Sequence, residues 1–187
     1  MPSIVPKTFY HTIYNSLFKS HLEFGILAFG CAKPSKLKKI VTLQKKCVRN
    51  VKNVGFMSHT DPLFNELKML RFEDLFKYNV CTFLHKYSTK RLPASFDNIF
   101  TFLRETDDRN NRDSFYNFKV ETPKNKALNT FPRVVFLPIW NSLSSLLQST
   151  ESHKVFKNDL QKDLVARYGD FVSCDNILCE ECRNNAN

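Results

Sequence analysis

The chain has 187 residues, of which 42% are hydrophobic and 18 are Phe, so it holds enough apolar material for a packed core, which argues against a wholly disordered chain. Its formal net charge of +10 favours a polyanionic partner, either nucleic acid or an anionic membrane surface. No window reaches the roughly 18 consecutive apolar residues of a membrane-spanning helix, and the first residues lack the apolar segment of a signal peptide. We therefore expect an intracellular protein of the nucleus or cytoplasm, without a membrane span and not secreted.

Residues 6–24 carry large apolar side chains at the i, i+3, i+4 spacing of an amphipathic helix. Its apolar positions are Phe9, Tyr10, Ile13, Tyr14, Leu17, Phe18 and Leu22. We expect them to form an aromatic, buried side, and we expect Gly25 to end the helix. Residues 26–29 are a short buried connection, of helix or strand type that periodicity does not decide.

Residues 34–53 predict one basic amphipathic helix, in which Pro34 suits the first turn. No acidic residue lies between Glu23 and Asp61, and the positive charges of this stretch are Lys33, Lys36, Lys38, Lys39, Lys45, Lys46, Arg49 and Lys52. The opposite stripe, mainly apolar, consists of Leu37, Ile40, Val41, Gln44, Val48 and Val51. The pattern therefore predicts a narrow buried stripe and a broad cationic face.

Two further helices are expected before residue 93. The first covers residues 61–70, with Asp61 as N-cap and Pro62 at the first helical position. A strong apolar stripe then continues from residue 72 to about 87. Pro93 ends this run, because a proline cannot donate a backbone hydrogen bond inside a helix.

The sequence changes character between about residues 96 and 133, where prolines and polar runs interrupt the periodicity. We expect a long irregular connection there, which is uncommon within a compact domain unless it is functional or disordered. Residues 115–120 are suited to a short strand or to packing on the body of the protein.

The last part of the chain predicts further helices. Residues 134–140 are apolar and broken by Pro138, and a short helix is expected after them, around residues 143–147. A final helix extends from Ser152, its N-cap, to Tyr168, with Gly169 just beyond its end. Both end signals are typical of helices.

The predicted fold is mainly α, a helical bundle with a long irregular connection and C-terminal helices. We expect a helical domain over residues 1–93 and the irregular connection over 94–133. A helical segment over 134–171 should pack on the first domain, and a polar tail with cysteines should cover 172–187.

The cationic face is either simply solvated or it binds a polyanion. Ordinary exposed helices mix charge signs, whereas this one accepts repeated repulsion between like charges, which favours binding. The candidate nucleic-acid-binding residues are Lys36, Lys38, Lys39, Lys45, Lys46, Arg49 and Lys52. Along one edge lie Lys38, Lys45, Arg49 and Lys52, at spacings of seven, four and three residues. Anionic lipid is an alternative partner, but the apolar stripe is narrow for insertion.

The six cysteines fall into two groups. Cys174, Cys179 and Cys182 contain a C-x2-C half-site that suits tetrahedral zinc, but a fourth ligand is missing, and the alternative is a disordered tail. Apart from this weak zinc candidate we expect no cofactor. Single cysteines in apolar patterns, expected to be free and to behave as small hydrophobic residues, are Cys31, Cys47 and Cys81.

No other pattern predicts catalysis. Spacing supports neither a Ser-His-Asp nor a Cys-His arrangement, and the four glycines are too few for a phosphate-binding loop. We expect His59 to hydrogen-bond within the turn before Asp61. We expect Trp140 to anchor the core rather than to stack on a base.

The order of short motifs along residues 9–168 resembles the region after the catalytic palm in LINE-type (jockey-like) non-LTR retrotransposon reverse transcriptases. The motifs of the first half are Phe24-Gly25-Ile26, Leu37-Lys38-Lys39-Ile40, Leu43-Gln44-Lys45-Lys46, His59-Thr60-Asp61-Pro62-Leu63-Phe64, Leu67-Lys68-Met69-Leu70 and Phe72-Glu73-Asp74-Leu75. Further matches are Phe83-Leu84-His85-Lys86-Tyr87, Leu92-Pro93 with Phe96, and Trp140-Asn141 followed by Phe156-Lys157. The chain departs from the family pattern just before the Trp-Asn pair. The family usually has a glycine-containing stretch there, and this chain has Phe136-Leu137-Pro138-Ile139.

The resemblance implies that residues 1–93 are a polymerase thumb, whose basic helix grips RNA or an RNA–DNA duplex beside the palm and fingers of a parent polymerase. A polymerase holds two metal ions on a pair of palm carboxylates. The only adjacent Asp pair, Asp107 and Asp108, lies in a polar loop without the expected aromatic hairpin, so we expect no catalysis by this chain alone. The alternative function is that of a helical protein-interaction or domesticated transposon-derived protein that does not bind nucleic acid.

Overall fold

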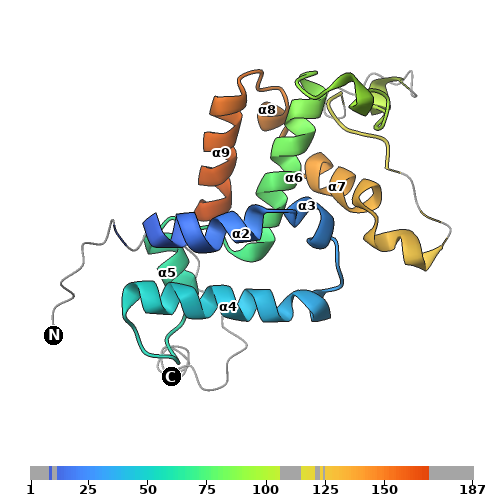
Figure 1. Cartoon of the computed structure of the whole chain (residues 1–187). Helices are drawn as coiled ribbons and strands as arrows, with labels where there is room; N and C mark the ends of the chain where they lie inside the picture. The colour runs from blue at the N-terminus through green and yellow to red at the C-terminus, as the bar shows by residue number, and fades with distance from the viewer. Residues whose placement is uncertain (1–8, 10–11, 106–114, 121–122, 124, 169–187) are drawn as a thin grey trace, which may run out of the picture. The chain divides into compact units, whose positions relative to one another are not determined.

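The computed structural model describes residues 9, 12–105, 115–120, 123 and 125–168, and over these residues the protein is mainly helical (Figure 1). The described residues divide into two compact units, and the division falls within helices α6 (Phe72–Ser88) and α9 (His153–Ala166). Unit 1 takes its described residues from the ranges Met1–Gly25, Pro34–Leu75 and Lys162–Asn187, and unit 2 takes its described residues from Ile26–Lys33 and Phe76–Gln161. These units differ from the boundaries at residues 93, 133 and 171 that the sequence suggests.

Unit 1 begins with the N-terminal helix, which includes a π-helical stretch, η1 (Tyr14–Lys19), and α2 (Ser20–Glu23). The hydroxyl of Ser16 donates to the carbonyl of Thr12 over 2.7 Å, and that of Ser20 donates to the carbonyl of Ser16. Such bonds compete with the regular backbone ladder. The helix ends as expected at Gly25, whose φ of 70° is a conformation that favours glycine.

The rest of unit 1 is built around α4 (Pro34–Lys52), with α5 (Asp61–Glu66) next in the chain. Figure 1 shows α4 beside the N-terminal helix, with α5 at its carboxyl end. The buried core between them consists of Tyr14, Val48, Phe64, Leu67, Met69 and Tyr168. The periodic stripe of the basic helix therefore does face a core, as its spacing predicts.

The helix expected over residues 61–70 is shorter than predicted, because α5 ends at Glu66 and Lys68 has a φ of 50°, which a helix cannot contain. Its N-cap is Thr60 rather than Asp61, which lies in the first turn. There the Asp61 carboxylate is 3.4 Å from Nε of Arg71, and an acidic side chain in a first turn complements the helix dipole.

Gln44 ties three segments of unit 1 together. Its side chain is 1% exposed, and its Nε2 donates to the hydroxyl of Tyr14 and to the carbonyl of Leu70, each over 2.9 Å. Its Oε1 accepts from the backbone N–H of Phe72 over 2.7 Å. Burial raises the pKa of Tyr14 to about 12, so this phenol stays neutral. One amide thus joins η1, α4 and the segment that starts α6.

A second polar group closes unit 1 where α6 begins. The hydroxyl of Tyr168 donates to the carboxylate of Asp74 over 2.6 Å and accepts from the N–H of Arg71 over 3.0 Å. The Arg71 guanidinium also lies 4.2 Å from the centre of the Tyr168 ring. Burial, followed by the bond to Asp74, raises the pKa of Tyr168. These contacts join the end of the described chain to Arg71 and to the first turn of α6.

Unit 2 starts with α3 (Ile26–Phe29), which is helical where periodicity left helix and strand open. The irregular connection contains only short 3-10 turns within its described part: η2 (Ala94–Phe96), η3 (Leu103–Glu105) and η5 (Lys126–Thr130). An antiparallel bridge joins Phe102 and Phe118 in the same segment. Helices α7 (Pro132–Asn141), α8 (Ser145–Gln148) and α9 follow.

The segment around the bridge is held by side chains of α7. Trp140 is fully buried, as expected of a core anchor, and its indole N–H donates to the carbonyl of Tyr116 over 2.9 Å. The amide of Asn141 both accepts from the N–H and donates to the carbonyl of Phe118, each over 2.9 Å. Asn141 therefore supplies the pair of hydrogen bonds that a neighbouring strand would otherwise provide.

The prediction that Pro138 breaks the apolar stretch is wrong. Pro138 lies inside α7, which continues beyond it. A proline there removes one hydrogen bond of the helix ladder. The helix nevertheless continues, and the N–H of Ser142 reaches the carbonyl of Pro138 over 3.1 Å. Phe136, Leu137 and Trp140, which flank Pro138 in the sequence, are buried, and their burial stabilises α7 despite the missing hydrogen bond.

We predict that Gln44→Leu destabilises the protein by about 2–4 kcal/mol, because it leaves a buried phenol, carbonyl and N–H without their shared partner. Urea unfolding would measure the change. Asn50→Leu, an exposed position of the same helix, is the control and should change the free energy of unfolding by less than about 0.5 kcal/mol. Equal stability of Gln44→Leu and the wild type would contradict the role of this amide.

Candidate nucleic-acid interface

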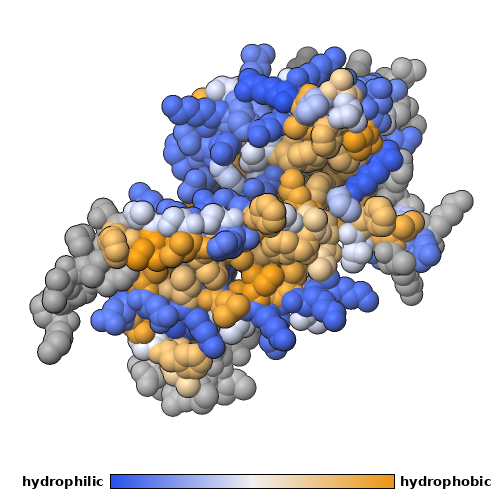
Figure 2. Space-filling model, in the orientation of Figure 1, coloured by the Kyte–Doolittle hydropathy of each residue, from blue (hydrophilic) through white to orange (hydrophobic). Residues whose placement is uncertain are grey.

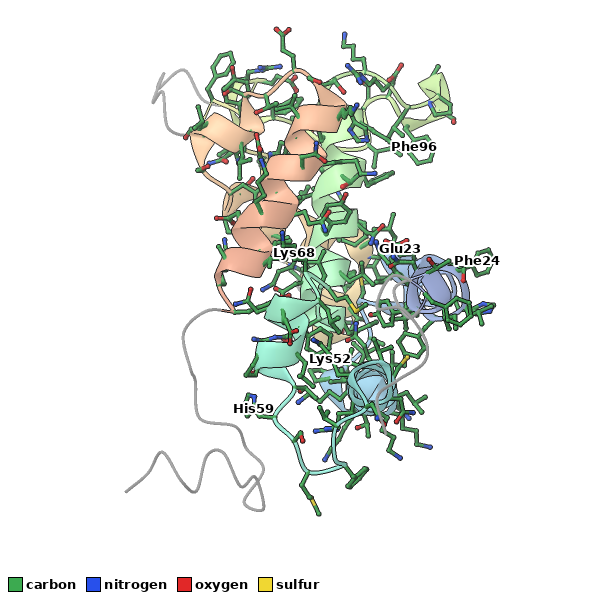
Figure 3. The ribbon with its side chains drawn as sticks, turned by 90° about the vertical axis from the view of Figure 1, so that its left-hand side faces the viewer. Glu23, Phe24, Lys52, His59, Lys68 and Phe96 are labelled. Carbon is green, nitrogen blue, oxygen red and sulfur yellow. The ribbon has the colours of Figure 1, made fainter. Side chains whose placement is uncertain are left out.

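The cationic face of α4 is exposed as predicted over most of its length. With Gln44 and Val48 turned into the core, the side chains of Lys36, Lys38, Lys39, Lys45 and Lys46 are exposed. Figure 3 looks along α4 and shows nitrogen-tipped side chains projecting on the side away from the N-terminal helix. The face carries positive charge along a 19-residue helix without a carboxylate on the same helix.

Two of the predicted binding cations, Arg49 and Lys52, also make contacts within the protein. Lys52 is half-buried and forms an ion pair with Glu66 of α5. Arg49, also half-buried, donates from Nε to the carbonyl of Ser58 over 2.8 Å. Both contacts hold the loop between α4 and α5. Of the four residues along the predicted edge, Lys38 and Lys45 are exposed, whereas Arg49 and Lys52 make these contacts.

The loop after α4 presents an aromatic residue that sequence reasoning missed. Phe56 is 67% exposed and Met57 is 41% exposed, and both lie at the tip of a turn. In Figure 2 an apolar cluster lies over this loop, beside the hydrophilic row of α4. The only sequence signal for it is the apolar pair Phe56-Met57 directly after Gly55.

The N-terminal helix exposes apolar residues that the sequence placed on its buried side. Tyr14 and Leu22 are buried, but Phe9 is 53%, Ile13 38% and Leu17 62% exposed. Phe24, which was not among the predicted buried positions and follows α2 as its C-cap, is 85% exposed. Figure 3 shows Phe24 pointing outward, and in Figure 2 orange atoms gather over this helix. The helix is apolar on two adjacent faces, and only one of them faces the core.

The remaining sequence candidates are not brought together. His59 lies in the turn as expected, where its Nδ1 accepts from the N–H of Asp61 over 3.1 Å. Asp107 and Asp108, and the tail cysteines Cys174, Cys179 and Cys182, lie outside the described residues. Among the residues that the structure describes, no cluster of three His, Cys, Asp or Glu side chains is suited to a metal ion. Cys31, Cys47 and Cys81 are free, and burial raises the pKa of each thiol.

A histidine pair in unit 2 was not anticipated. His85 is fully buried, stacks on Phe156 with ring centres 4.2 Å apart, and approaches the carbonyl of Thr150 with Nε2 at 2.7 Å. Since a carbonyl only accepts, Nε2 of His85 carries the proton. Its Nδ1 then accepts, over 3.1 Å, from Nδ1 of His153. The pair joins α6 to the start of α9.

The environment of this pair keeps both rings neutral. Burial lowers the pKa of His85, the hydrogen bond to Thr150 partly opposes this, and Arg91 lowers the pKa further. Burial, then His85, then the cations Lys86, Lys157 and Arg91 lower the pKa of His153. A proton on Nδ1 of His85 would also remove the acceptor of the hydrogen bond between the two Nδ1 atoms. The pair is a structural contact within unit 2.

Comparison of the chain with protein-family models, with curated proteins and with solved structures finds no match. None of the helices over the described ranges combines the length and the apolar character needed to cross a bilayer.

We predict that Arg49→Met destabilises the protein by about 1–2 kcal/mol, whereas Lys45→Met changes its stability by less than about 0.5 kcal/mol. Both variants lose one positive charge on α4, but only Arg49 holds the carbonyl of Ser58. Urea unfolding distinguishes them. Equal effects of the two substitutions would show that Arg49 is as free as Lys45.

The histidine pair predicts a loss of stability in acid. Because the folded-state pKa values lie below the unfolded value of about 6.5, the unfolded chain binds protons first as the pH falls below that value. The free energy of unfolding is then at its full value above about pH 6.5 and declines below it, by at most about 1.4 kcal/mol per pH unit for each ring.

Urea unfolding at several pH values would test this, with His85→Gln expected to flatten the decline. Phe156→Leu is the control, because it removes the stacking on His85 and keeps both titrating rings. It should lower stability and retain the acid dependence. If the stability of His85→Gln declined with falling pH as steeply as that of the wild type, the acid dependence could not be assigned to this histidine pair.

Proposed function

We propose that the chain is the non-catalytic C-terminal part of a LINE-type retrotransposon reverse transcriptase, an RNA-directed DNA polymerase, and that it binds RNA or the template–primer duplex through α4. The observation that carries this proposal is the cationic face of five exposed lysines, Lys36, Lys38, Lys39, Lys45 and Lys46, on a helix without carboxylates. The ordered motifs that resemble this family support the same proposal.

The chemistry of the face suits a phosphate backbone. Lysines neutralise phosphates and release condensed counterions, which supplies affinity without much sequence preference. The face is also mounted on a fixed support, since Gln44 ties α4 to η1 and to the start of α6. Binding therefore orders only the lysine side chains, and the backbone of the helix is already in place.

Under this proposal, polymerisation is catalysed by residues outside this chain. The palm and fingers of a parent polymerase would supply the carboxylates that hold the metal ions, and the present chain would hold the duplex behind them. The partners are then RNA or an RNA–DNA duplex and the rest of the polymerase.

One observation favours a second candidate function, that of a helical protein-interaction or domesticated transposon-derived protein. The exposed apolar row Phe9, Ile13, Leu17 and Phe24 on the N-terminal helix is suited to a partner chain, because burying such side chains is the main driving force of association. This function makes no use of the lysines on α4.

We predict that Lys38→Glu/Lys45→Glu weakens binding to an RNA–DNA duplex and lowers the log–log salt slope by about 2, because two phosphate contacts are lost. Both lysines are exposed, so the fold should be retained. Fluorescence anisotropy with a labelled duplex at a series of salt concentrations gives affinity and slope together.

The matched control is Lys119→Glu/Lys154→Glu, which makes the same change in net charge at exposed positions of unit 2. It should leave the slope close to that of the wild type. Equal slopes in both double variants would overturn the assignment to α4. A wild-type chain indifferent to nucleic acid at physiological salt would favour the protein-interaction function.

A further inference from the structure

The turn between α4 and α5 holds Phe56 in a defined position. The N–H of Ser58 donates to the carbonyl of Gly55 over 3.1 Å, so Phe56 and Met57 are the two central residues of a hydrogen-bonded turn. The carbonyl of Ser58 is in turn held by Nε of Arg49 over 2.8 Å. The N–H of Val54 returns to the carbonyl of Arg49 over 3.1 Å. Both sides of the turn are thus anchored to the last turns of α4.

The ring of Phe56 stands beside cations of the candidate interface. Nζ of Lys46 is 5.9 Å and Cζ of Arg49 is 5.8 Å from the ring centre, within the range of cation–π attraction. Phe56 nevertheless remains 67% exposed as a residue, so the cations leave it accessible. An exposed aromatic ring beside cations matches the two parts of a nucleotide, a flat base and an anionic phosphate.

We propose that Phe56 is a stacking platform for an unpaired base, with Lys46 facing the neighbouring phosphate, so that the interface takes single-stranded nucleic acid where a strand leaves the duplex on α4. This inference rests on the proposed function and adds a ligand to its site. Stacking on an aromatic ring tolerates every base, so the platform adds affinity for unpaired strands without sequence preference.

The shape of the site favours a nucleotide over a lipid surface. Only Phe56 and Met57 of the turn present exposed large apolar side chains, whereas membrane-surface helices bury a broad apolar face. The cations also extend along α4 from Lys36 to Lys46, as the phosphates of a strand do, so the row of charge continues beyond the turn.

The test compares Phe56→Ala with the wild type on a blunt RNA–DNA duplex and on the same duplex with a single-stranded overhang. The wild type should bind the overhang substrate more tightly, and Phe56→Ala should lose about tenfold in affinity for it while keeping blunt-duplex affinity and salt slope. Phe56→Trp should restore the overhang preference, and its added indole fluorescence should be quenched by the overhang.

The outcomes separate this inference from the function it rests on. Salt-dependent binding of both substrates with no effect of Phe56→Ala overturns the platform and leaves the proposed function standing. Absence of duplex binding in the wild type overturns both. A loss of binding to phosphatidylserine vesicles in Phe56→Ala, with nucleic-acid affinity unchanged, would assign the turn to a membrane surface and overturn the platform.

Discussion

The amide of Gln44 is the interaction on which the arrangement of unit 1 depends. A buried glutamine costs free energy unless its nitrogen and oxygen both find partners. Here the partners are Tyr14, Leu70 and Phe72, which belong to the N-terminal helix and to the segment that leads into α6. Because hydrogen bonds are directional, these contacts fix the rotation of α4 about its axis, which apolar packing alone leaves loosely defined. That rotation determines which side of α4 is exposed, and the exposed side carries the lysines.

The positive charges of α4 have two different roles. Arg49 and Lys52, in its last turn, hold the following loop through Ser58 and Glu66. The lysines nearer the start of the helix are exposed and give the face its uncompensated field. The change of role occurs within one helix, so the charged face and the anchored turn with Phe56 form one continuous surface. A strand that follows the lysines would meet the aromatic ring at the end of its path.

Local pattern predicted the mainly helical fold and the long helices closely. The basic helix was expected over 34–53 and covers Pro34–Lys52, and the next long helix was expected from residue 72 to about 87 and ends at Ser88. Contacts between distant segments could not be predicted, because spacing shows that Gln44 faces inward but not that Leu70 lies opposite it. For the same reason the sequence overestimated the buried side of the N-terminal helix, where Leu17 is exposed, and did not show that Arg49 contacts Ser58.

Chemical modification of the lysines, with and without an RNA–DNA duplex, tests the central claim most directly, because mass spectrometry reports each side chain of the folded protein separately. The account predicts that the duplex slows modification of Lys36, Lys38, Lys39, Lys45 and Lys46. It predicts no change at the exposed lysines Lys90, Lys119 and Lys154 of unit 2. Unchanged modification along α4 in the presence of saturating duplex, or equal protection of both sets, would contradict it.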